Sequence, residues 1–171
     1  MQDELLNGEI ALSPGPNRRH QDICHQLHRL LEALVRPEFV VRGDTTINLA
    51  GWQGKEGPRP DVFVIDSERW VDADQHDGYP VGSPQLVIEV KSPSNSDDEL
   101  RHKAALFFAD SALAVWTVDP ERECVTAYRT MEDYQECGLG TLVELPDGIC
   151  IYKSASISVS EIFDGIVQKL L

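Results

Sequence analysis

The stretch Pro84-Gln85-Leu86-Val87-Ile88-Glu89-Val90-Lys91-Ser92-Pro93-Ser94 decides the fold of this chain. Its apolar and β-branched residues are bounded by prolines, which predicts a buried strand that ends in a turn. Side chains alternate along a strand, so Glu89 and Lys91 share one face, roughly 6.7 Å apart. Because burying a charged group is costly, the pair indicates either a structural salt bridge or a reactive site.

A second acidic residue lies upstream, at the start of another short apolar run. Asp61 follows a proline and precedes Val62-Phe63-Val64-Ile65. If the two runs pair in a sheet, Asp61 and Glu89 can hold one cation, and the Val90 carbonyl can add a third oxygen ligand. Magnesium prefers oxygen ligands and keeps several waters, which suits a substrate phosphate. Lys91 would then position the attacking water and neutralise charge, giving a centre for phosphodiester hydrolysis.

Further short motifs stand around these acids in a fixed order. From the N-terminus they are Gly8-Glu9-Ile10, Ser13-Pro14 followed by His20, Arg59-Pro60-Asp61-Val62, Ile88-Glu89-Val90, Ser92-Pro93-Ser94, Lys103 and Val115-Trp116-Thr117-Val118-Asp119-Pro120. Together they resemble the Uma-two family of putative restriction endonucleases, over nearly the whole chain. Within them, Pro60-Asp61 and Glu89-Val90-Lys91 are similar to the PD-(D/E)xK nuclease motif.

The resemblance implies a fold and an activity. The fold is of the α/β (α+β) class, a restriction-endonuclease-like mixed sheet flanked by helices. The implied activity is that of an endonuclease which uses Mg²⁺ or Mn²⁺ and acts on nucleic acid, with DNA favoured over RNA. Members of the family often assemble as homodimers, so we expect a homodimer here.

Two lysines compete for the role beside the acids. Lys91 fits the short motif, whereas many relatives lack that lysine and rely on one in the next helix, where this chain has Lys103. Ser96 and Glu99 form a capping box that predicts this helix, with Lys103 on the flank of its apolar stripe. Lys103 can turn towards the sheet or extend outwards to solvent, so the choice between the two lysines stays open.

A helix is predicted over residues 17–35, because apolar residues recur there at helical intervals. His20 faces inward at its N-terminus, next to Arg18 and Arg19. Free amides at a helix N-terminus favour anions, so His20 can contact a phosphate, or it can be a core histidine bonded to backbone. Glu9 can complete the metal site or be a surface carboxylate.

The charge of the chain restricts its partners. The 171 residues, 42% of them hydrophobic, fit a single domain over 1–171. A net charge of −14 opposes long-range attraction to nucleic acid. Acidic residues concentrate after residue 60, so we expect Arg18, Arg19 and Arg59 to supply nucleic-acid contacts. The acidity also leaves open a nuclease-fold protein that binds a partner or small ligand without cleavage, and a metal-dependent hydrolase of another phosphate ester.

Cysteine usage and hydropathy bear on location. The four cysteines form no CxxC pair and show no zinc-like spacing with histidine, so we expect them to be reduced. No stretch approaches the length that spans a bilayer, and no export signal begins the chain. We therefore expect a cytoplasmic protein without a membrane segment.

Other elements follow from the same patterns. Residues 86–119 predict a parallel β-α-β unit, and residues 124–130 an antiparallel neighbour. A strand is also expected over residues 5–12, with Asn7-Gly8 as a turn, and another over residues 35–49, with Gly43-Asp44 as a bend or turn that can split it. Residues 67–83 are expected to be a solvated loop.

Overall fold

A mixed sheet of six strands carries the fold in the computed structural model, which describes residues 2–6, 9–13, 17–51 and 57–164, the first two ranges by their backbone only. In spatial order the strands are β3 (Phe39–Arg42), β4 (Val62–Asp66), β5 (Leu86–Val90), β6 (Ala114–Asp119), β7 (Cys124–Tyr128) and β8 (Tyr134–Gly138). Only the β5–β6 pair is parallel; the other neighbours in this sheet are antiparallel. The mixed sheet and its parallel unit are as predicted.

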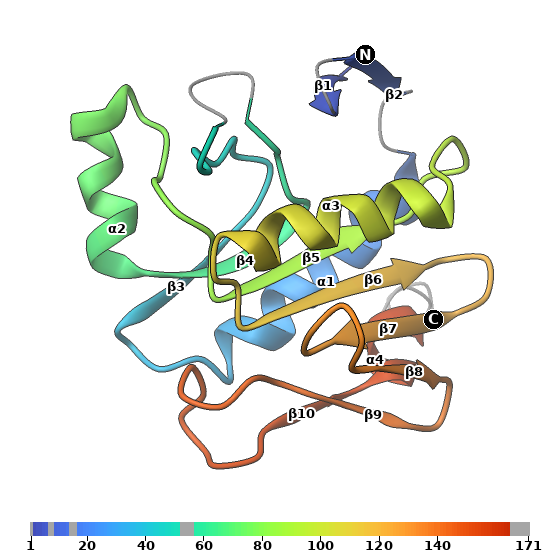
Figure 1. Ribbon diagram of the computed structural model, residues 1–171. Helices are drawn as coiled ribbons and strands as arrows, with labels where there is room; N and C mark the ends of the chain where they lie inside the picture. Colours follow the sequence, from blue (N-terminus) through green and yellow to red (C-terminus); the bar gives the residue numbers. More distant parts are fainter. Residues whose placement is uncertain (1, 7–8, 14–16, 52–56, 165–171) are drawn as a thin grey trace.

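Helices cover both faces of this sheet (Figure 1). They are α1 (Arg18–Glu32), α2 (Ser67–Asp72), α3 (Asp97–Ala109) and α4 (Val159–Asp164), with a 3-10 turn, η2 (Ala73–His76), after α2. The Asn17 side chain caps α1, and Ser96 with Glu99 forms the predicted capping box of α3. Among the described residues, no helix has the length and apolar character needed to cross a bilayer.

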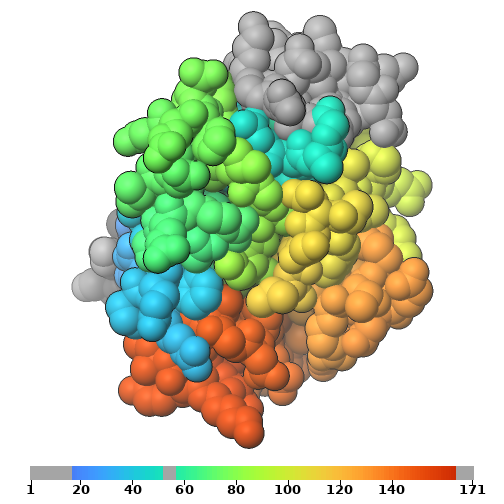
Figure 2. Space-filling model, turned by 60° about the vertical axis from the view of Figure 1, so that its left-hand side comes forward, coloured from blue at the N-terminus to red at the C-terminus, as the bar shows by residue number. Residues whose placement is uncertain are grey.

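Strand β5 is buried on both sides and separates two apolar clusters. Leu86, Ile88 and Val90 pack with α1, α4 and the last strands, whereas Val87 packs with Ala104 and Phe107 of α3. This alternation is the one expected from the sequence, and it directs Glu89 towards α3. On the surface, α3 lies between the α2 segment and the β7–β8 segment (Figure 2, yellow between green and orange).

Two local predictions are confirmed in part, and a third was wrong. Two strands, β1 (Gln2–Leu6) and β2 (Glu9–Ser13), pair antiparallel where one strand with a turn at Asn7-Gly8 was expected, and that turn lies outside the described residues. Within residues 35–49 the strand is β3 alone, which ends at the expected bend, where Asp44 takes a left-handed backbone conformation (φ 52°). The loop expected over residues 67–83 begins with α2, a helix too short to show a periodic pattern. A second small sheet pairs β9 (Leu142–Glu144) with β10 (Ser156–Ser158).

Candidate active site

Asp61 lies directly before β4, at the end of the sheet where β5 finishes. The register pairs Val62, the first residue of β4, with Ile88 of β5, so Asp61 precedes the paired residues. Asp61 Oδ2 accepts a hydrogen bond from the Val90 amide at 2.7 Å. The side chain of Asp61 therefore takes the place of a backbone acceptor, which fixes the position of its carboxylate.

Glycine at position 43 makes this placement possible. A Cβ atom on Gly43 would lie 2.3 Å from the carbonyl oxygen of Asp61, far inside van der Waals contact. The next residue donates its amide to the Pro60 carbonyl at 3.1 Å. The segment after β3 thus packs backbone to backbone against the segment that carries Asp61.

Glu89 and Lys103 form a buried ion pair between β5 and α3. Their residues are 4% and 6% exposed, and Lys103 Nζ lies 2.9 Å from Glu89 Oε2. Of the two orientations that the sequence allowed for Lys103, the structure has the one towards the sheet. A buried carboxylate and ammonium in contact are costly to separate, so the pair holds both side chains in place.

His20 faces inward from the first turn of α1, as expected, and is 9% exposed. Its Nε2 lies 3.3 Å from Asp61 Oδ1. Burial lowers the pKa of the imidazole, but the hydrogen bond and charge of Asp61, a hydrogen bond to the Val90 backbone and the charge of Asp44 raise it more. The balance leaves the pKa of His20 above its ordinary value, so the protonated form is favoured beside Asp61.

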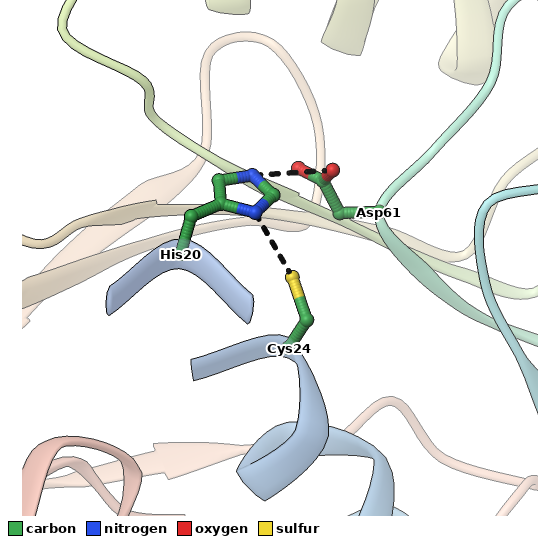
Figure 3. A group of neighbouring side chains, drawn as sticks. All are labelled: His20, Cys24 and Asp61. Atoms are coloured by element: carbon green, nitrogen blue, oxygen red, sulfur yellow. Dashed lines mark hydrogen bonds and ion pairs between the residues drawn. The ribbon is translucent and has the colours of Figure 1, made fainter. Parts of the chain in front are cut away.

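Cys24 extends this contact on the other side of the imidazole (Figure 3). Its Sγ lies 3.6 Å from His20 Nδ1. Burial, followed by the charges of Asp61, Glu89 and Asp44, raises the pKa of the thiol. We did not foresee Cys24 in the site, although its spacing of four residues from His20 places both on one side of a helix.

Lys91 lies apart from Glu89. The strand ends at Val90, so alternation no longer directs the Lys91 side chain, and its Nζ lies 2.7 Å from Asp97 Oδ1 and 3.5 Å from Asp119 Oδ2. The hydrogen bond to Asp97 is the largest effect on the pKa of Lys91 and raises it; burial, the next largest, lowers it, and the charges of Asp119 and Asp97 add to the net rise. The structure brings Lys103, rather than Lys91, into contact with Glu89.

A pocket of about 340 Å³ opens between the start of α1 and the ends of β5 and β6. Its lining includes Arg19, His20 and Lys91, three side chains that carry or accept positive charge. Asn17, the cap of α1, and Asp119 also line it. His20, which contacts Asp61, lines this pocket together with the cationic side chains of Arg19 and Lys91, so the pocket lies next to the part of the site that contains Asp61.

The three arginines expected to contact nucleic acid each lie near one acidic residue. Surface pairs of this kind contribute little to stability, so they can exchange for another anion. The pairs are Arg18 Nε with Asp22 Oδ2 at 3.6 Å, Arg19 Nη2 with Glu123 Oε1 at 3.1 Å, and Arg59 Nε with Asp44 Oδ1 at 3.4 Å. Glu9 begins β2, and its side chain lies outside the described residues.

Asp61, Glu89 and the Val90 carbonyl are the oxygen donors that the sequence suggested for a divalent cation. The charges of Asp61 and Glu89 both contribute to the raised pKa of the Cys24 thiol. The Val90 backbone approaches both Asp61 and His20 there. Two carboxylates with a nearby carbonyl are the donor set that magnesium and manganese accept.

Comparisons with known proteins identify a family and a shared fold. The family model Uma2, described as a putative restriction endonuclease, matches residues 2–150. The crystal structure of a putative nuclease from Anabaena variabilis superposes with a TM-score of 0.78 at 18% sequence identity, covering 95% of this chain and 89% of that chain. At this identity the likeness shows a shared fold. No curated protein matches the sequence.

Proposed function

Because this chain belongs to the Uma2 family of putative restriction endonucleases, we propose that it hydrolyses phosphodiester bonds of nucleic acid with a divalent cation. One observation carries the proposal. Asp61 lies directly before β4 and accepts a hydrogen bond from Val90 at the end of β5, and Glu89 in β5 is in contact with the buried ammonium of Lys103. Two carboxylates and a lysine are the groups that the chemistry needs.

Each residue has a role in this proposal. Asp61 and Glu89, with the Val90 carbonyl, would hold Mg²⁺ or Mn²⁺. A cation there supplies Lewis acidity and makes a bound water more acidic. Lys103 fixes the orientation of Glu89 and offers an ammonium that can position water or neutralise developing charge. His20 holds Asp61 through its hydrogen bond.

The pocket beside the acids would receive the substrate backbone. Lys91 and Arg19 line it, and the backbone amides at the N-terminus of α1 favour an anion. Phosphate contacts of this kind would be local, since the net charge of −14 repels nucleic acid at a distance. We propose DNA as the substrate, with Arg18 and Arg59 as further contacts, and Glu9 as a further acid of the site.

Cleavage assays test the proposal. Purified protein is incubated with plasmid, single-stranded DNA and RNA, with Mg²⁺, Mn²⁺ or chelator. We expect cation-dependent cutting that falls by at least about 100-fold in Asp61→Asn and in Glu89→Gln, as for loss of a group that stabilises the transition state. Asp133→Asn removes a fully exposed carboxylate and is the matched control.

Two outcomes would contradict it. Cutting that persists in Asp61→Asn would come from a contaminating nuclease. Folded protein that cuts none of the three substrates would favour the rival that the acidic composition supports, a nuclease-fold protein that binds a partner or small ligand. A panel of small phosphate esters then separates binding from a different hydrolase activity.

We also propose a single domain, a homodimer and a cytoplasmic location. Large apolar side chains are exposed at Tyr134, Leu139 and Leu142, around β8 and β9, where a second copy could cover them. The four cysteines are free, as in a reducing compartment. Light scattering should give twice the mass of the chain, and a monomer would contradict the homodimer. Calorimetry should give one unfolding transition, and two separate transitions would contradict the single domain.

A further inference from the structure

Three side chains of different chemistry meet at the inner end of the site. His20 and Cys24 lie one turn apart on α1, and Asp61 approaches them from the segment before β4 (Figure 3). One ligand atom from each of the three residues lies within 4.8 Å of the others. The imidazole lies between the other two groups, with the thiol next to Nδ1 and the carboxylate next to Nε2, and all three are close enough for one cation to draw them together.

The distances agree with a tetrahedral zinc site. Zinc binds thiolate sulfur at about 2.3 Å and imidazole nitrogen at about 2.0–2.1 Å, so tetrahedral geometry separates the sulfur from the nitrogen by about 3.5 Å. The observed separation of Cys24 Sγ from His20 Nδ1 is 3.6 Å. The helix therefore presents these two atoms at the spacing that a shared cation requires.

The chemistry of the donors selects the kind of cation. Sulfur and nitrogen ligands favour zinc and similar metals, whereas magnesium and calcium favour oxygen ligands alone. The set of His20, Cys24 and Asp61 therefore favours a different cation from the set of Asp61, Glu89 and the Val90 carbonyl, although Asp61 belongs to both.

The contacts from Cys24 to His20 and from His20 to Asp61 also resemble the triad of a thiol hydrolase, but the charges around the Cys24 thiol oppose that function. A nucleophilic cysteine needs a positive environment that favours its thiolate. Here the charges of Asp61, Glu89 and Asp44 act on the thiol together with burial, and all of them disfavour the thiolate. The same negative charges favour a bound divalent cation.

We propose that His20, Cys24 and Asp61 form a binding site for Zn²⁺ or a similar thiophilic cation, with a fourth position open to water. When the metal binds, the Cys24 thiol loses its proton to solvent, and the protonated His20 imidazole also releases a proton to solvent and binds in its neutral form. Binding at this site does not require nuclease activity. Since Asp61 belongs to both donor sets, zinc would also withdraw it from the proposed catalytic centre.

Cobalt spectroscopy of the full chain tests this proposal without a nuclease assay. Co²⁺ is added to metal-free protein, and absorption from thiolate-to-cobalt charge transfer is followed in the near ultraviolet. We expect a band that saturates at one Co²⁺ per chain and that Zn²⁺ removes by competition. Cys24→Ser should abolish the band, and His20→Asn and Asp61→Asn should each weaken cobalt binding by at least about 10-fold to 100-fold.

The control is Cys124→Ser, which changes a buried cysteine of β7 and should keep the band. Circular dichroism checks that each variant is folded. Absence of the band in the wild-type protein, or its persistence in folded Cys24→Ser, would overturn the zinc site. Protein that cuts nucleic acid but lacks the band contradicts the zinc site alone, and a Cys24-dependent band without cutting contradicts the nuclease alone.

Discussion

The buried pair between Glu89 and Lys103 allows one prediction to be worked out in detail. The perturbation is Lys103→Met, which keeps the aliphatic part of the side chain and removes the ammonium. The Glu89 carboxylate, 4% exposed, then stays in the interior without the cation that lies 2.9 Å from it. We expect a large loss of stability.

The size of the loss follows from the burial. Removing one partner of a buried ion pair costs about 3–5 kcal/mol. An unfolding entropy of about 2.1 cal/mol/K per residue gives about 0.36 kcal/mol/K for the 171 residues. The melting temperature should therefore fall by about 8–14 °C.

Lys91→Met is the matched control, because Lys91 is also a lysine paired with carboxylates near the site. Its side chain is 24% exposed and that of Asp97 is 79% exposed. The pair with Asp97 is therefore solvated on one side, and Asp119, the second partner of Lys91, keeps hydrogen bonds from the amides of Glu121 and Arg122 when the lysine is removed. The loss should be about 0.2–1 kcal/mol, so the melting temperature should fall by about 1–3 °C.

Calorimetry of four proteins completes the test: the wild type, the two single variants, and Glu89→Gln combined with Lys103→Met. The double variant should recover most of the loss, because the buried charge that needs compensation is gone. Equal losses for the two lysine variants, or a double variant no more stable than Lys103→Met, would show that the pair does not control stability in this way.

Three shorter predictions follow from other contacts. Asp61 raises the pKa of His20 above 6.5, so His20 should stabilise the protein relative to His20→Gln. This difference in unfolding free energy, measured by chemical denaturation, should be fully present below pH 6.5 and lost as the pH rises through the raised pKa. A difference that grows with pH would contradict this. Gly43→Ala should cost about 1–3 kcal/mol by collision with the Asp61 carbonyl, whereas Gly138→Ala, with no atom within 4 Å of the added Cβ, should cost less; equal melting temperatures would refute the close approach. Micromolar Zn²⁺ should reduce Mg²⁺-dependent cutting by the wild type, and the ratio of cutting with and without Zn²⁺ should approach one in Cys24→Ser; equal inhibition of both proteins would exclude this route.

The parts of the fold that the sequence revealed are those with strong local signals. The apolar run that ends at Val90 is β5, and the box of Ser96 and Glu99 begins α3. The structure differs where backbone packing overrides side-chain pattern. The bend at Gly43-Asp44 was expected from the sequence, but the close approach of Gly43 to the Asp61 carbonyl was not, because a hydropathy pattern does not contain that contact.

The site divides in the same way. Strand alternation was enough to set Glu89 on one face of β5, but it no longer applied to Lys91, one residue beyond the strand end. The orientation of Lys103 depended on how α3 packs on the sheet, which the sequence left open. Cys24 was overlooked because we compared cysteines with zinc motifs of short spacing and did not consider one helical turn.

The two oxygens of Asp61 have separate partners, and this has a kinetic consequence. The Val90 amide holds Oδ2, so the carboxylate cannot rotate without breaking that bond. His20 is near Oδ1, the oxygen left for an incoming ion. An ion that binds Oδ1 without binding His20 would need the imidazole to move aside, so the rate of its uptake would be set by motion in the first turn of α1. The strength of binding would be set by the ligands themselves.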